Sequence, residues 1–111
     1  MNHLISAVQN VDPVLVASLL ENGADATIDD NQPILSACQG GGEGTRNIIR
    51  MLVEYGGDVH ARGDLPLLLA IQNRDLAKIK LIVELGNNNH LYPRDMAYML
   101  EKRYKIIIPW K

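Results

Sequence analysis

The residues that could carry chemistry in this sequence of 111 residues fall into a few small groups. The first is a glycine-rich run, 40–45, at the start of a predicted helix, because glycine-rich helix starts can hold phosphate through backbone N–H groups. A nucleotide-binding loop, however, needs a lysine before the hydroxyl residue and a strand ahead of the glycines. Both are missing here, and Glu43 would repel an anion. We therefore interpret the run as a flexible insertion between two helices.

The histidines could in principle bind a metal ion. His60 and His90 each follow a glycine by four residues, so we expect them in a row on exposed connections, while His3 lies at the other end of the chain. Zinc needs three or four ligands in a tetrahedral array, and two aligned histidines do not provide them. Exposed surface histidines are the better interpretation, and we predict no metal and no cofactor.

Composition limits the remaining classes. The chain is 47% hydrophobic and has a net charge of -2, so it can fold as one domain and lacks the positive charge that nucleic-acid and membrane binding require. The uncharged apolar stretches 14–20 and 65–71 are shorter than the ~20 residues that cross a bilayer. The N-terminal residues do not resemble a secretory signal, and a single cysteine suits a reducing compartment. We expect a cytoplasmic protein that binds neither nucleic acid nor membrane.

An internal repeat organises the sequence. Apolar segments end in Gly23, Gly56 and Gly86, where a left-handed helix end favours glycine. A second series pairs each proline with an alanine four residues later: Pro33 with Ala37, Pro66 with Ala70 and Pro93 with Ala97, while Ala7 follows His3. The distance from alanine to glycine is 16, 19 and 16 residues in the three units. The middle unit therefore has three extra residues, which fall in the glycine-rich run.

Each unit is predicted to contain a first helix that begins near the proline, a tight turn, and a second helix that ends before the glycine. Asp12 and Asp75 are predicted N-caps of second helices, and Thr45 is the matching residue once the insertion is counted. Helices of about a dozen residues are marginal alone, so stacked units must supply the stability. Cys38 shares its repeat position with Val8 and Ile71, which predicts a buried small residue and not a nucleophile.

The predicted fold is an all-α helical solenoid of three repeats, 2–30, 31–62 and 63–90, followed by a C-terminal half-repeat cap, 91–111. We call the three repeats units one, two and three. Pro109 falls where a second helix of the last unit would need its middle. The apolar tail 103–111 is expected to cover the last repeat, and partner docking is the alternative for it.

This pattern resembles the ankyrin repeat family. The family's T-P-L-H-x-A opening is similar to residues 32–37 and 65–70, and its L-L-x-x-G-A-D-x-N-A ending is similar to residues 19–26 and 52–61. Ten residues separate Gly23 from Pro33 and Gly56 from Pro66, about three fewer than in the family. Such short connections are similar to those of ankyrin arrays encoded by large DNA viruses. The resemblance implies an ankyrin-like solenoid with a concave binding groove made of first helices and adjacent connections.

Polar residues near the ends of the first helices are the candidate partner-binding residues. Glutamine recurs two residues after alanine, and amides both donate and accept hydrogen bonds. These positions are Gln9, Asn10, Gln39, Gln72 and Asn73, and the resemblance adds the connection residues Asp29, Asn31, Arg62 and Asp64. Ordinary solvated surface is the alternative interpretation. No histidine, carboxylate and nucleophile converge, so we predict no enzyme.

The predicted function is a protein–protein interaction module, acting as an adaptor or as an inhibitor that covers its partner. The alternative is a structural subunit assembled through its ends and tail. Charge is unevenly distributed: residues 1–45 contain six acids and no Lys or Arg, a net charge of -6, whereas residues 46–111 contain seven acids and eleven bases, a net charge of +4. This polarity could orient a partner or permit weak head-to-tail contacts between otherwise monomeric copies.

Overall fold

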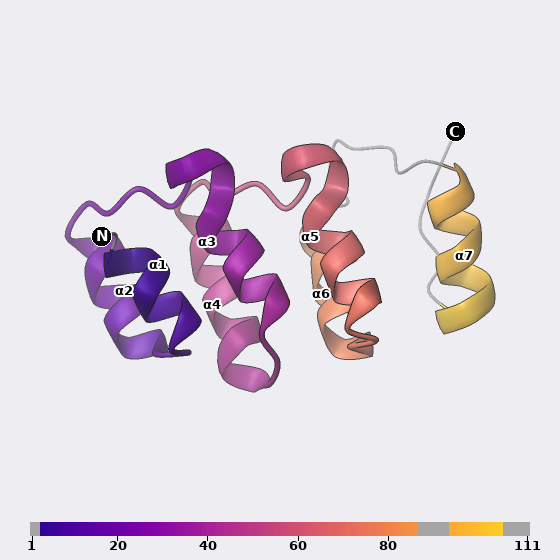
Figure 1. Ribbon diagram of the computed structural model, residues 1–111, viewed down its shortest axis with the longest axis horizontal. Coiled ribbons are helices and arrows are strands. Elements are labelled where there is room, and N and C mark those ends of the chain that lie inside the picture. The colour runs from indigo at the N-terminus through magenta and orange to yellow at the C-terminus, as the bar shows by residue number, and fades with distance from the viewer. Residues whose placement is uncertain (1–2, 87–93, 106–111) are drawn as a thin grey trace.

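Helices follow one another in pairs along the chain (Figure 1). The computed structural model describes residues 3–86 and 94–105, and for residues 94–97 it describes the backbone alone. The helices are α1 (His3–Gln9), α2 (Pro13–Glu21), α3 (Ile28–Gln39), α4 (Glu43–Glu54), α5 (Ala61–Gln72), α6 (Leu76–Leu85) and α7 (Arg94–Tyr104). No strand occurs in these described ranges. The all-α prediction is confirmed.

The helix pairs stack into an elongated array of 40 × 25 × 19 Å. The first helices α1, α3 and α5 pack side by side in one row, the second helices α2, α4 and α6 form another, and each first helix packs on the second helix of its own unit. α7 stands at the end of the array opposite α1 and α2 (Figure 1). This arrangement is the predicted helical repeat array followed by a further first helix. The repeat boundaries remain a prediction, and Pro93, Pro109 and the tail from 106 onward lie outside the described residues.

Two of the three predicted helix starts are confirmed. The Asp12 and Asp75 carboxylates each accept a hydrogen bond from a backbone N–H three residues on, at 3.1 Å in both cases. The prediction for Thr45 is wrong, because α4 begins at Glu43 with Gly42 as its N-cap. Gly42 has a φ of 94°, which glycine adopts without strain, so the inserted residues turn the chain earlier. Thr45 is buried in the first turn and donates to the Gly41 carbonyl oxygen at 2.9 Å.

Two of the three predicted glycine ends are also confirmed. Gly23 and Gly56 have φ values of 96° and 99°, in the left-handed region. Gly86 has a φ of -96°, so the expectation of a left-handed end is wrong there. Gly86 is buried, and its carbonyl oxygen faces the ring of His60. The chain therefore leaves α6 at Gly86 without the left-handed turn found at Gly23 and Gly56.

The two described connections between units, which follow α2 and α4, each end in a short left-handed turn. Residues 29–31 and 62–64 all have φ values between 52° and 67°, immediately ahead of the helical turn that contains Pro33 or Pro66. Most of these residues are Asp, Asn or Gly, the types that tolerate this region best. Each proline then lies in the first turn of the regular helix, where its missing N–H costs nothing. A single tight turn thus explains how ten residues suffice between glycine and proline.

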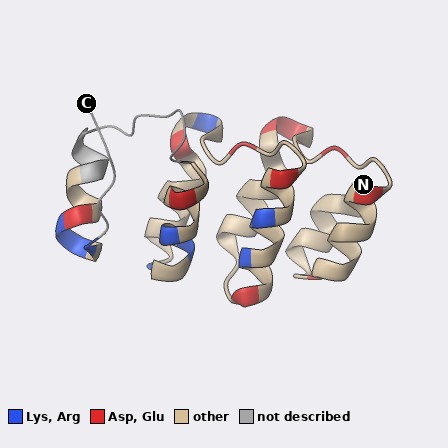
Figure 2. Cartoon of the chain, turned by 180° about the vertical axis from the view of Figure 1, so that it is seen from behind, with Lys and Arg blue, Asp and Glu red and all other residues tan. Residues whose placement is uncertain are grey.

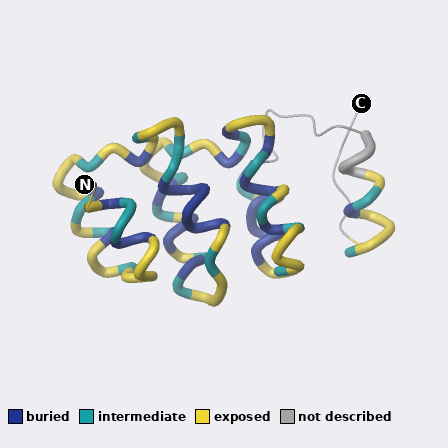
Figure 3. The backbone as a smooth tube through the Cα atoms, viewed as in Figure 1, coloured by how far each residue is buried: buried dark blue, intermediate teal, exposed yellow. Residues whose placement is uncertain are grey.

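Buried residues of both helix rows form one hydrophobic cluster, and Figure 3 shows such residues along the array. Ala7, Ala37 and Ala70 are all buried, as close approach of neighbouring units requires. Ile34, Leu52 and other large aliphatic residues fill the remaining space, and full burial of each contributes about 1.5–3 kcal/mol. Leu100 of α7 is fully buried against the same core, so α7 continues the array.

Candidate functional site

A row of glutamines lies along one edge of the first-helix layer. Gln9, Gln39 and Gln72 are the last residues of α1, α3 and α5, and all three are exposed. Because these helices pack side by side, the three amides follow one another along the array. Asn10 is also exposed and extends this edge into the α1–α2 turn. The structure therefore brings together four of the residues predicted from the sequence.

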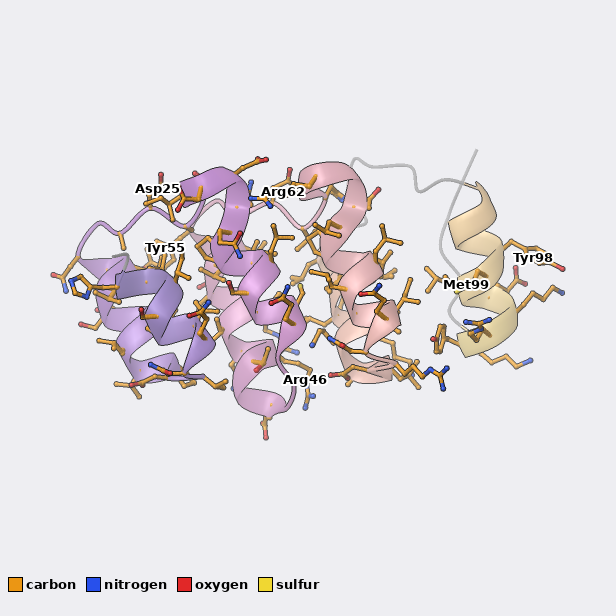
Figure 4. All side chains as sticks on the ribbon, viewed as in Figure 1. Asp25, Arg46, Tyr55, Arg62, Tyr98 and Met99 are labelled. Carbon is orange, nitrogen blue, oxygen red and sulfur yellow. The ribbon has the colours of Figure 1, made fainter. Side chains whose placement is uncertain are left out.

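The connection residues lie at the opposite ends of the same helices. Asp29 and Arg62 are exposed there, and Asn31 is half-buried. Figure 4 shows Arg62 at the connection ahead of α5. From Pro33 to Gln39 the helical rise spans about 9 Å. The predicted site thus consists of two polar edges separated by the faces of the first helices.

Several of these connection residues bond to the neighbouring connection. The Asn31 side-chain oxygen accepts a hydrogen bond from the Asp58 N–H at 3.0 Å. The Arg62 guanidinium donates to the carbonyl oxygens of Asp29 at 2.8 Å and Asp30 at 3.2 Å, and its Nε lies 3.3 Å from the Asp30 carboxylate. These bonds fix consecutive units relative to one another. The carboxylate of Asp29 and part of Arg62 still face solvent.

Asp64 is the predicted site residue with the least access to solvent. It is buried, and its Oδ1 lies 2.6 Å from Nδ1 of His60, whose Nε2 lies 2.7 Å from the Gly86 carbonyl oxygen. Both oxygens are acceptors, so the ring serves both when each nitrogen carries a proton. The expectation of an exposed His60 is therefore wrong, because the ring joins a connection to the end of α6. His90 lies outside the described residues.

Asn73 is exposed but takes part in a polar cluster between units two and three. The Cys38 carbonyl oxygen accepts from Asn73 Nδ2 at 3.1 Å and from Lys78 Nζ at 2.8 Å. The Lys78 ammonium also donates to the Gly40 carbonyl oxygen and lies 3.8 Å from the Asp75 carboxylate. Burial lowers the pKa of Lys78, and the nearby Asp75 carboxylate partly offsets this effect.

Sequence reasoning missed Lys78, although a signal for it was present. Lys78 stands eight residues before Gly86, the repeat position that Leu15 and Ile48 occupy before Gly23 and Gly56. A lysine at an otherwise apolar repeat position must find acceptors inside the protein, since burying an isolated charge is costly. The carbonyl groups at the end of α3 provide those acceptors.

The surroundings of Cys38 do not activate its thiol. Cys38 is fully buried, as predicted, and burial raises the pKa of its thiol to about 12. Within residues 3–86 and 94–105, no three His, Cys, Asp or Glu side chains gather as metal ligands. No helix in these same ranges has the length and apolar character needed to cross a membrane.

Charge follows the sequence order along the array. Figure 2 shows acidic residues at the end of α2 and in the first connections, and Lys and Arg from α4 onward. In the first connection the Asp25 carboxylate accepts from the Thr27 hydroxyl at 2.7 Å and from the Thr27 N–H at 2.9 Å. These bonds hold the pKa of Asp25 below its ordinary value, so this exposed group stays ionised. One end of the molecule is therefore acidic.

Comparison with known proteins agrees with this architecture. Residues 4–92 match the family described as ankyrin repeats (3 copies). An ankyrin repeat protein of Acanthamoeba polyphaga mimivirus is 45% identical over 47 residues, which cover 42% of this chain and 16% of the viral protein. No solved structure gives a significant match. Ankyrin repeats generally serve protein–protein interaction, and since the family match covers most of the sequence, this chain belongs to the ankyrin repeat family.

Proposed function

We propose that this chain binds another protein through its first-helix layer, namely the exposed C-terminal ends of α1, α3 and α5 and the connections at the opposite ends of these helices. The observation that carries the proposal is the row of Gln9, Gln39 and Gln72, three identical exposed side chains at one position of three packed helices. Neighbouring helix axes lie about 8–10 Å apart, so the row extends over roughly 20 Å. That length matches about six residues of an extended segment, whose backbone groups amides can satisfy by donating and accepting.

The proposed activity needs binding alone. A surface of this size suits an adaptor, or an inhibitor that covers the working surface of its partner in the cytoplasm. The partner is a protein and not a nucleic acid or a membrane, because the net charge of -2 gives no general attraction to phosphate. Asp29 and Arg62 extend the contact onto the connections, where both are exposed. Asp64 contributes by holding its connection in place.

The test is affinity capture from the cells that produce the protein, with three baits. The first is the natural chain, and the second carries Gln9→Ala, Gln39→Ala and Gln72→Ala. The third is a matched control with alanine at three exposed positions of the second helices, namely Arg50, Glu54 and Lys80. A protein retained by the first and third baits is then titrated against purified chains. The glutamine variant should weaken binding more than about tenfold while its unfolding curve is unchanged.

Two outcomes would contradict the proposal. In the first, the glutamine variant retains the partner as well as the natural chain does. In the second, the control variant loses the partner to the same extent, which would place the contact on the second helices. A structural subunit assembled through its ends would also keep its partner in the glutamine variant, so the experiment separates these two functions.

A further inference from the structure

Leu15 is exposed at a repeat position that is buried in the other two units. Its side chain is 44% exposed, whereas Ile48 and Lys78, at the same distance from their glycines, are both 0% exposed. One turn further along the helix, Leu19 is half-buried, while its counterparts Leu52 and Ile82 are fully buried. Hydrophobicity does not explain this difference in exposure, because the apolar Leu15 is exposed while the charged Lys78 is buried. The difference depends instead on which neighbouring residues cover the position.

The contacts of Lys78 show which way this position faces. Its ammonium group bonds to the carbonyl oxygens of Cys38 and Gly40, at the C-terminal end of the first helix of the preceding unit. Leu15, at the same position in unit one, therefore faces the side of the array that precedes α1 and α2. A partner that covered Leu15 in the same way would present the C-terminal end of a first helix.

The opposite end of the array exposes the matching position. Cys38 comes one residue after Ala37, and Tyr98 comes one residue after Ala97, so the two share a repeat position. Cys38 is fully buried beneath the following unit, whereas Tyr98 is 62% exposed on α7. Figure 4 shows Tyr98 on the side of α7 that points away from the array. Leu15 and Tyr98 are thus exposed at the two positions that meet inside the array as Lys78 and Cys38.

The two ends also carry opposite charges. Val14 is exposed beside Leu15. The acids Asp12 and Glu21 are also exposed in unit one, which contains no Lys or Arg. On α7 the Lys102 ammonium lies 5.6 Å from the centre of the Tyr98 ring, and two further basic residues, Arg103 and Lys105, follow. A translation along the long axis brings an acidic apolar end onto a basic aromatic end. A two-fold symmetric contact at Leu15 would instead oppose acid to acid.

The C-terminal end of α7 and the α1–α2 turn lie at the same edge of the molecule (Figures 1 and 2), so a shift along the long axis brings these two edges together. We propose that a second copy of this chain stacks head to tail on the first, with Leu15 of one copy packing against Tyr98 of the next and with acidic residues of unit one facing the basic end of α7. The contact is heterologous, so it leaves one free end of each kind and can extend into a chain of copies.

The first test is sedimentation velocity over a wide concentration range at low and at high salt. The natural chain should associate with increasing concentration, and more strongly at low salt because salt screens the charge contribution. Leu15→Glu should raise the dissociation constant more than about tenfold, because it places a charge in the apolar contact. The control is Leu76→Glu, since Leu76 is 41% exposed in the first turn of α6, which belongs neither to unit one nor to α7.

The second test mixes two variants that each block one end. Leu15→Glu leaves the α7 end intact, and Tyr98→Glu leaves unit one intact. The glutamate at position 98 can pair with Lys102 four residues on, so α7 should remain helical in this variant. Each variant alone should be monomeric, and the mixture should form a dimer and nothing larger. A natural chain that stays monomeric at all concentrations overturns the proposal. The proposal is also overturned if the mixture stays monomeric or if either variant alone forms a dimer. It is overturned as well if Leu76→Glu weakens association as much as Leu15→Glu does.

Discussion

Lys78 and Cys38 belong to adjacent repeat units, and the buried ammonium group of Lys78 donates to the Cys38 carbonyl oxygen at 2.8 Å. The same ammonium group reaches the carbonyl oxygen of Gly40, the first glycine of the insertion in unit two. The end of α3 is therefore capped by a side chain from the next unit. This bond explains how the extra residues are accommodated, because it fixes the start of the inserted loop to α6.

The first prediction concerns the pH dependence that this buried ammonium group imposes. Burial lowers the folded-state pKa of Lys78 below the ordinary 10.5, so the unfolded chain binds its proton more tightly. Unfolding then takes up a proton, and this contribution to stability rises as pH increases from the lowered pKa toward 10.5. Urea unfolding of the natural chain and of Lys78→Met is measured across this pH range. As pH increases, the free energy of unfolding of the natural chain should rise relative to that of the variant. Lys80→Met, at an exposed position, is the control. A difference between natural chain and Lys78→Met that is independent of pH would contradict the prediction.

The second prediction concerns the reactivity of Cys38. An ordinary thiol with a pKa of 9.0 is about one-tenth ionised at pH 8, whereas a thiol with a pKa of about 12 is ionised to roughly one part in ten thousand. Alkylation of the folded protein should therefore be more than about a hundredfold slower than alkylation in urea. The measurement is the rate of labelling by a maleimide, followed by mass spectrometry. Comparable rates in both conditions would show that Cys38 is accessible in the folded chain.

Much of the fold could be predicted from the sequence because the repeat places the same physical requirement at fixed intervals. Asp12 and Asp75 cap helices because a carboxylate at that position accepts a free N–H, whatever the surrounding fold. The prediction of Thr45 as an N-cap is wrong because counting residues assigns the whole insertion to the loop, whereas Gly42 allows the helix to begin earlier. The prediction of a left-handed end is wrong at Gly86, where φ is -96°, because glycine adopts negative φ values as readily as positive ones and its presence alone does not specify the turn.

The candidate site was predictable only in part, for a related reason. Gln9, Gln39 and Gln72 follow from periodicity, because one repeat position faces one direction. Asp64 and His60 are polar residues whose side chains turn inward to bond with groups up to 26 residues away. Such pairings depend on how units stack, and periodicity does not specify the direction in which a connection side chain points.

The third prediction tests the role of His60. His60→Ala removes the contacts of the ring with the Asp64 carboxylate and the Gly86 carbonyl oxygen, both of which are buried. Loss of such bonds should lower the free energy of unfolding by about 1–3 kcal/mol. Urea unfolding measures this change, and His3→Ala, at an exposed position in α1, should have little effect. Equal stabilities of these two variants would mean that the ring does not hold the connection to α6.

The last prediction separates two glycines that differ in their surroundings. A Cβ on Gly57 would lie 2.6 Å from Cδ1 of Ile34 and 2.8 Å from the backbone oxygen of Leu52. Ile34 is fully buried, and the Leu52 oxygen accepts the N–H of Gly57 at 2.8 Å, so neither group can move away cheaply. Gly57→Ala should therefore lower the free energy of unfolding by about 1–3 kcal/mol, the usual cost of overpacking a core.

Gly41→Ala is the matched control, because a Cβ there meets no heavy atom within 4 Å. Its effect on urea unfolding should stay within about 0.5 kcal/mol. If the two variants were equally stable, α4 would have room to shift away from the connection at Gly57, and the tight packing seen there would not constrain the chain.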